Sequence, residues 1–225
     1  MPSRASLVCQ VFLGTSIVAL VGIRSLAADE PIRQRRYEHG PLTAADFRAP
    51  PPELRESIYG RRVLAYTFTE CNYTYGYQYS FTDNSATASL TKLDFHAVLI
   101  PEKSWNVTPG DARLLDHEQG HFDITHAAAL AAQRQWDRRL RREKIEVRAA
   151  TVDAAKRRLK DRVEQLIQPI FDELSAAHKT YDRETEHGTD AQQQSSHRHS
   201  QQQRLKSLGE ELSKRQTGND RSDMK

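Results

Sequence analysis

The chain has few of the residues that constrain a fold covalently or give it a strong charge. Its 225 residues include two cysteines, and the formal net charge is +3. Cys9 lies in the apolar N-terminal stretch, so Cys71 would be alone after removal of that stretch and could form no internal disulfide. The arginine clusters alternate with acidic residues and lack aromatic neighbours, so we expect no nucleic-acid partner.

The apolar run at the N-terminus predicts a secretory signal peptide. Residues 1–27 combine a basic start at Arg4, an apolar run and small residues near Ala27. Polar residues interrupt the run and Arg24 follows it, which favours a cleaved signal over a membrane-spanning helix. We therefore expect a secreted or periplasmic protein with no stable membrane insertion after cleavage.

The next part of the chain predicts an extended segment followed by strands. Residues 28–57 are rich in proline and charge, which is typical of an extended lead-in. In residues 61–81, aromatic and β-branched residues recur with a period of two. A turn signal at 83–85 precedes a second strand pattern at 89–101. These patterns predict a small antiparallel sheet of three or four strands.

Two long helices are predicted after the sheet. Thr108 is suited to cap the first helix, Pro109 suits its first position, and the helix should end near Leu140. Its apolar residues recur every seven positions, at Leu115, Phe122, Ala129 and Trp136. In the second helix, apolar residues recur every three or four positions, with a kink expected at Pro169: Val152, Ala155, Leu159, Val163, Leu166, Ile170 and Leu174.

The C-terminal part has a different composition. Residues 189–225 are rich in glutamine, serine and charge and poor in apolar side chains, which predicts a disordered polar tail. The predicted organisation is thus a lead-in, one folded domain over residues 58–188, and this tail.

The stretch LLDHEQGHFDITH, residues 114–126, contains the pattern H-E-x-x-H at His117, Glu118 and His121. Residues four apart lie on one face of a helix, so both imidazoles can face one ion, with Glu118 about 100° around the helix. Zinc binds imidazole nitrogens, and a catalytic zinc site uses three protein ligands and leaves one position open. The spacing predicts a zinc cofactor, with Glu118 as general base.

The third ligand must come from outside this motif. His126 lies nine residues after His117, about 180° around a continuous helix, and no glycine separates it from His121. His187 is the first candidate, because Gly188 can turn the chain back toward the motif helix. Asp182 is a second choice, as ligand or as partner of an imidazole N–H. Carboxylates of the second helix are further choices, namely Glu164, Asp172 and Glu173.

Tyr181 is a candidate for a supporting catalytic role. It precedes Asp182 in the stretch YDRETEHG, residues 181–188. Its hydroxyl could donate a hydrogen bond to the oxyanion that develops during hydrolysis of a carbonyl group.

Two separated motifs resemble a known family. HEQGHFDI at 117–124, together with YDRETEHG at 181–188, is similar to the bacterial predicted secreted zinc-dependent proteases. Weaker similarity extends over about residues 37–188. The resemblance implies a zincin-like fold, a zinc site at His117 and His121 with Glu118 as base, and His187 as the third ligand ahead of the alternatives.

We therefore expect an α+β, zincin-like protein in which a small antiparallel sheet precedes the H-E-x-x-H helix and a second long packed helix. The expected activity is hydrolysis of peptide or protein substrates by a monomeric zinc peptidase. One alternative is a noncatalytic, zinc-stabilised periplasmic binding module. Another is a structural envelope protein that interacts through its basic helices.

Overall fold

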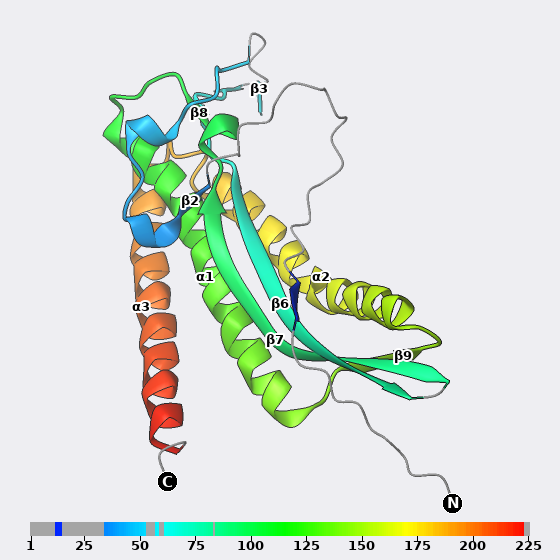
Figure 1. The fold of residues 1–225 in the computed structure, drawn as a ribbon. Coiled ribbons are helices and arrows are strands. Elements are labelled where there is room, and N and C mark those ends of the chain that lie inside the picture. Colours follow the sequence, from blue (N-terminus) through cyan, green and yellow to red (C-terminus); the bar gives the residue numbers. More distant parts are fainter. Residues whose placement is uncertain (1–11, 15–33, 53–56, 59–60, 83, 223–225) are drawn as a thin grey trace, which may run out of the picture. The chain divides into compact units, whose positions relative to one another are not determined.

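The fold combines a small antiparallel sheet with long helices, which confirms the expected α+β class (Figure 1). The structure is a computed structural model that describes residues 12–14, 34–52, 57–58, 61–82 and 84–222. The predicted signal segment 1–27 lies outside the described residues, except for a short strand, β1 (Phe12–Gly14). None of the described helices is long and apolar enough to span a membrane.

The sheet is built on one long hairpin, where period-two alternation predicted strands. Strands β6 (Thr69–Thr82) and β7 (Ser85–Leu99) form the hairpin. β1 pairs with β6, and β7 pairs with β2 (Arg35–Arg36) and β9 (Glu146–Ala149), all antiparallel. Two short pairs are separate: β3 (Ser57–Ile58) with β4 (Arg61–Arg62), and β5 (Ala65–Tyr66) with β8 (Trp105–Asn106). The main sheet thus has five strands rather than three or four.

The first two long helices, α1 (Ala112–Arg142) and α2 (Val152–Glu184), lie where apolar periodicity predicted them. α1 begins later than expected, because its cap is Asp111 rather than Thr108. The Asp111 carboxylate accepts hydrogen bonds from the backbone N–H groups of Arg113 and Leu114. Short 3₁₀ turns occur in the lead-in and after β7: η1 (Tyr37–His39), η2 (Ala44–Asp46) and η3 (Pro101–Lys103).

The prediction of a disordered tail is wrong for most of its length, because residues Ala191–Ser222 form a third helix, α3. Asp190 caps this helix by accepting hydrogen bonds from the backbone N–H groups of Gln192 and Gln193. Gln194 and Arg198 then bind α1 through polar contacts. The low apolar content of this segment predicted disorder, but hydrogen bonds and ion pairs rather than apolar packing anchor the helix.

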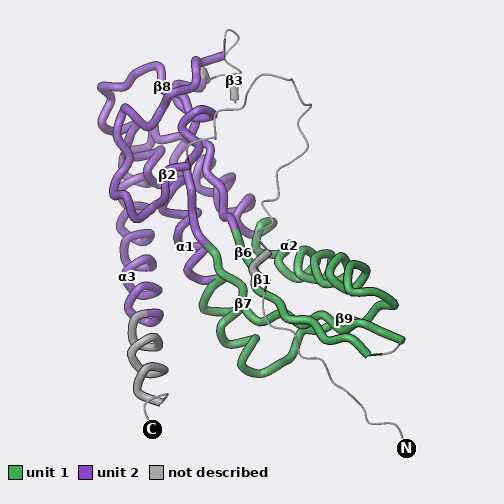
Figure 2. Tube along the Cα trace, viewed as in Figure 1, with its two compact units in different colours: residues 1–19, 73–95, 132–172 green, residues 20–72, 96–131, 173–225 purple. Residues whose placement is uncertain are grey.

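The chain divides into two compact units rather than the single domain expected for 58–188 (Figure 2). Unit 1 contains residues 73–95 and 132–172, and unit 2 contains residues 20–72, 96–131 and 173–225. Strands β6 and β7 and helices α1 and α2 contribute one part to each unit. All residues of the predicted site except Glu164 and Asp172 belong to unit 2.

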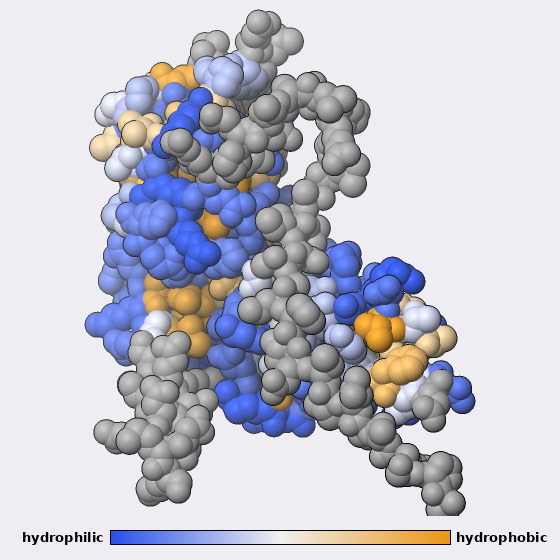
Figure 3. All heavy atoms as spheres, in the orientation of Figure 1, coloured by the Kyte–Doolittle hydropathy of each residue, from blue (hydrophilic) through white to orange (hydrophobic). Residues whose placement is uncertain are grey.

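Unit 1 has a hydrophobic core in which aromatic residues of β6 meet the apolar faces of the two helices. Trp136 of α1 is 1% exposed, and Leu159 and Val163 of α2 are equally inaccessible. Tyr73 and Tyr75 of β6 pack in the same cluster. Large side chains are mostly inside, and hydrophobic colouring is limited to small patches on the face drawn in Figure 3.

Replacement of Trp136 tests this core. Trp136→Ala should lower the free energy of unfolding by about 3–5 kcal/mol, because it leaves a large cavity. Phe81, which is 52% exposed, provides the matched aromatic control, and Phe81→Ala should change stability by no more than about 0.5 kcal/mol. Urea unfolding followed by circular dichroism measures both. Equal losses in the two variants would contradict the assigned core.

Candidate metal centre

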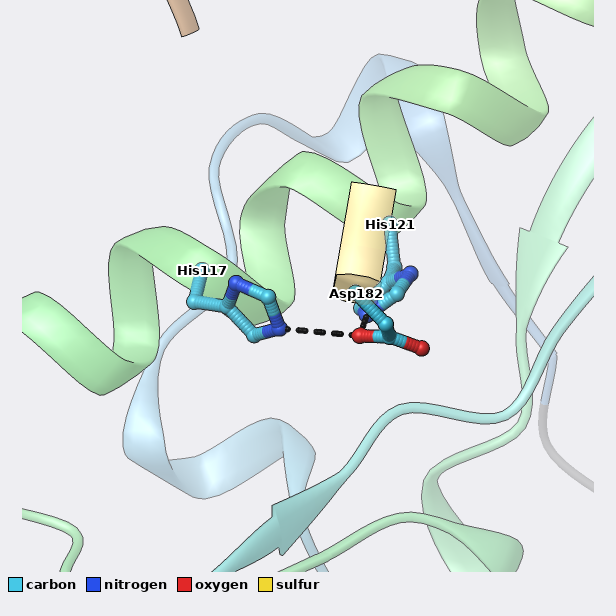
Figure 4. Close-up of side chains that lie close together, drawn as sticks. All are labelled: His117, His121 and Asp182. Carbon is cyan, nitrogen blue, oxygen red and sulfur yellow. Dashed lines mark hydrogen bonds and ion pairs between the residues drawn. The ribbon is translucent and has the colours of Figure 1, made fainter. Parts of the chain in front are cut away.

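His117 and His121 point toward a common position from one face of α1 (Figure 4). Their four-residue spacing on a continuous helix produces this arrangement, as the sequence predicted. The His117 side chain is 3% exposed and the His121 side chain 12% exposed. The two imidazoles therefore lie at the edge of the interior, where few water molecules compete for their nitrogens.

Asp182, near the end of α2, completes the group. Its Oδ1 atom lies 3.2 Å from His117 Nε2 and 3.0 Å from His121 Nε2 (Figure 4). One donor atom from each of these residues lies within 4.8 Å of the other two, which is close enough to hold a metal ion. The Asp182 side chain is 31% exposed, so the group has an open side. Two imidazole nitrogens and one carboxylate oxygen are thus available to one cation.

His187, the first choice for the third ligand, lies beside the group but is not part of it. Its Nδ1 atom is 3.5 Å from Asp182 Oδ1. His187 has a left-handed backbone conformation, with φ of 54°, in the turn after α2. Glu164 belongs to unit 1 and forms an ion pair with Lys160. Among the described residues, Asp182 therefore takes the place that the sequence gave first to His187.

Glu118 is buried next to the two histidines and is held by a threonine. Only 4% of Glu118 is exposed, and its Oε2 atom accepts a hydrogen bond from the Thr67 hydroxyl. Thr67 directly follows β5, whose Tyr66 is 47% exposed. Burial, and then the negative charge of Glu118, raise the pKa of Tyr66. The carboxylate therefore lies near an exposed strand, although it is itself inaccessible.

The surroundings of Tyr181 do not suit the predicted role of an oxyanion donor. Tyr181 is 1% exposed, its ring stacks on the His117 imidazole at 4.8 Å between centroids, and its hydroxyl donates to the His117 carbonyl at 3.4 Å. A Cβ atom on Gly120 would lie 2.2 Å from the Tyr181 hydroxyl oxygen. Tyr181 thus holds α2 against α1, and Gly120 leaves the space for it.

Electrostatics concentrate negative charge between the imidazoles. Burial alone would raise the pKa of Asp182, but hydrogen bonds and charge from His117 and His121 outweigh it and hold this pKa well below its usual range. Burial lowers the pKa of His121, but its hydrogen bond to Asp182 and that carboxylate's charge reverse the net shift, which is upward. The ionised Asp182 therefore attracts a cation, which could replace the protons on the two imidazole nitrogens that face it.

The remaining nitrogen of each histidine also has a polar neighbour. His117 Nδ1 lies 3.5 Å from the Thr185 hydroxyl oxygen, and His121 Nδ1 lies 2.9 Å from His178 Nδ1. Thr185 donates its own hydroxyl to the Tyr181 carbonyl, so its oxygen accepts from His117. Neither Thr185 nor His178 was predicted from the sequence, although His178 precedes Asp182 by one helical turn and so lies on the same face of α2.

Asp123, two residues after His121, joins three segments around the site. This residue is 3% exposed. Its carboxylate accepts hydrogen bonds from Tyr37 of the lead-in at 2.9 Å, Gln119 of α1 at 2.5 Å and Arg198 of α3 at 2.5 Å. Asp123 therefore has a structural role, since it ties the lead-in and α3 to α1. His126 faces away from the group and stacks on Tyr37 at 3.8 Å between centroids.

No known family, curated protein or solved structure matches this chain. The resemblance to secreted zinc-dependent proteases and the zincin-like fold therefore stay predictions. The function has to be inferred from the chemistry of the group itself.

The contact between Gly120 and Tyr181 can be tested with one methyl group. Gly120→Ala should destabilise the protein by about 1–3 kcal/mol, because the new Cβ overlaps a fully buried ring. Gly209, in α3, has no atom within 4 Å of an added Cβ, so Gly209→Ala should be neutral or stabilise by up to about 1 kcal/mol. Thermal unfolding of the two variants measures this contrast, and stabilisation by Gly120→Ala would contradict it.

Proposed function

We propose that the chain is a zinc-dependent peptidase whose ligands are His117, His121 and Asp182 and whose general base is Glu118. The observation that carries the proposal is the combination of three converging donor atoms with a buried carboxylate one residue after the first ligand. A structural metal site needs the donors alone. A hydrolytic site also needs a group that takes a proton from water, and we assign that role to Glu118, which directly follows the first ligand.

The donor set fits zinc. Imidazole nitrogen and carboxylate oxygen are both common zinc ligands, and three protein ligands leave one coordination position for water or substrate. The contacts of both Nδ1 atoms accommodate protons there, so each Nε2 atom can give up the proton that it donates to Asp182 and offer a lone pair to the ion. The Asp182 side chain is 31% exposed, so the donor set is open to solvent on that side.

Iron(II) is a second metal that this donor set accommodates, because two histidines and one carboxylate also bind iron in oxygenases. Glu118 favours the hydrolytic function. An oxygenase has no need for a buried base next to its ligands, whereas hydrolysis of an amide requires both removal of a proton from water and protonation of the leaving nitrogen.

The mechanism assigns each residue a defined task. When bound, zinc would make a water molecule acidic enough to ionise near pH 7 and would polarise the scissile carbonyl. Glu118 takes the proton of that water on a carboxylate oxygen and delivers it to the leaving amine. The Thr67 hydroxyl donates to Oε2 of Glu118 and so orients the carboxylate, which keeps further lone pairs for proton transfer. Tyr181 fixes His117 by stacking and does not contact substrate.

Peptides or proteins are the proposed substrates, and the compartment would be extracellular or periplasmic if residues 1–27 act as a signal peptide. The alternative is the noncatalytic binding module, in which the ion holds α1 to α2 and Glu118 has no chemical task. The two functions share the ligands and differ only in what Glu118 does.

The ligand assignment predicts an order of zinc affinities. His117→Ala and Asp182→Ala should each weaken zinc binding by more than about 100-fold, because loss of a ligand exceeds the effect of an outer neighbour. His187→Ala should weaken it by less than about tenfold. Asp172→Ala, on the exposed surface of α2, is the matched carboxylate control and should have no effect. Competition with a chromophoric chelator measures all four, and an effect of His187→Ala equal to that of His117→Ala would make His187 a ligand.

The catalytic assignment predicts separation of binding from turnover. Glu118→Gln should retain stoichiometric zinc and reduce cleavage of a mixed peptide library by at least about 100-fold, because the amide cannot accept the proton. Glu210→Gln, on the exposed side of α3, is the matched control. The outcome that favours the binding module is a wild type that binds stoichiometric zinc but cleaves no peptide that Glu118→Gln leaves intact.

A further inference from the structure

His178 is a partly buried side chain that the proposed mechanism does not use. It precedes Asp182 by one turn of α2, so both side chains face α1 from the same side. His178 Nδ1 lies 2.9 Å from His121 Nδ1, while Asp182 Oδ1 lies 3.0 Å from His121 Nε2. One imidazole is therefore contacted at both of its nitrogens by two residues of a single helix.

The far nitrogen of His178 has a partner that determines its own protonation. His178 Nε2 lies 3.3 Å from the Thr125 hydroxyl oxygen. Thr125 donates that hydroxyl to the His121 carbonyl at 3.1 Å, and its oxygen lies 2.8 Å from the Thr69 hydroxyl of β6. The threonine oxygen is thus an acceptor for His178, which places the His178 proton on Nε2 and leaves a lone pair on Nδ1.

We infer that His178 is a positioning residue that fixes His121 with its proton on Nδ1 and with Nε2 turned toward the cation. The lone pair on His178 Nδ1 accepts the His121 Nδ1 proton. The other tautomer of His121 would direct two lone pairs at each other across 2.9 Å and would present an N–H group to the ion. This inference rests on the proposed metal site but not on peptidase activity.

His178 is not itself placed to be a ligand. Its nearest contact in the group is with the His121 nitrogen that faces away from Asp182. The two nitrogens of one imidazole point in divergent directions, so an ion bound at His121 Nε2 is on the opposite side of that ring from His178. Its effect on the ion must therefore pass through the orientation and protonation of His121.

The Thr125 and Thr69 hydroxyls continue this arrangement within unit 2. Thr125 is fully buried, and it follows His121 by one turn of α1. Hydrogen bonds run from the His121 ring to His178, from His178 to Thr125, and from Thr125 back to the His121 carbonyl. They thus connect the His121 ring to its own backbone. Such a closed set of hydrogen bonds limits rotation of the His121 ring in the protein without metal.

Substitutions that keep or remove the acceptor test the inference. In the full chain, His178→Ala and His178→Phe should weaken zinc binding by about 10–100-fold, since each removes the acceptor for His121. His178→Gln offers a carbonyl oxygen and should stay within about fivefold of wild type, on the same outer-partner scale. His199→Ala, an exposed histidine of α3, is the matched control. Zinc alone is the probe, measured by competition with a chromophoric chelator.

The tautomer of His121 can be determined by NMR in the wild-type protein, so this test does not depend on whether a variant folds. Long-range ¹H–¹⁵N correlation spectra of the zinc-loaded protein should show His121 protonated on Nδ1, and the same state should become mixed in His178→Phe. Detection of the Nε2-protonated tautomer of His121 in the zinc-loaded wild type would overturn the inference. So would wild-type zinc affinity in both His178→Ala and His178→Phe.

Failure of this inference is distinguishable from failure of the proposed function. If His117→Ala also leaves zinc affinity unchanged, the metal site itself is wrong and the inference falls with it. If zinc binds, the His178 variants weaken it and no peptide is cleaved, the positioning role stands without the peptidase. If peptides are cleaved and the His178 variants bind zinc normally, the peptidase stands without the positioning role.

Discussion

The candidate site depends on the close contact between the Tyr181 ring and the surface of α1. Gly120 removes the side chain that would block this contact, and His117 provides the flat face on which the ring stacks. Because Tyr181 is rigidly placed, the next residue, Asp182, is delivered between the two imidazoles. A tyrosine buried for packing therefore determines whether a carboxylate 61 residues after His121 can act as a ligand.

Polar contacts then hold the outer segments against this contact. Gly188, with φ of 79°, approaches the His117 ring so closely that a Cβ atom would lie 2.9 Å from its Cγ. This turn starts α3, whose Arg198 binds Asp116 and Asp123 of α1. The pair with Asp123 is buried, so removal of either partner would leave an uncompensated charge in the interior. The lead-in and α3 are thus supports of the motif helix rather than independent appendages.

The sequence predicted the elements whose signal is local. The hairpin and the first two helices follow from periods of two and 3.6, and the pair His117 and His121 follows from helical spacing. What it missed depends on tertiary contacts: α3 is anchored by Arg198, and Asp182 replaces His187 because the end of α2 meets α1 before the turn. His178 was missed for the same reason, since its role exists only when α2 lies against His121. Tyr181 was assigned from its chemistry, whereas burial decides its role.

The central claim is that two imidazoles and one carboxylate hold one zinc ion. X-ray absorption at the zinc edge of the loaded full-length protein tests this directly, because the multiple scattering of imidazole counts the histidine ligands. The account predicts two imidazoles together with oxygen donors, all at about 2.0–2.2 Å. Three imidazoles would contradict it in favour of His187, and failure to bind one zinc ion per chain would contradict the metal centre altogether.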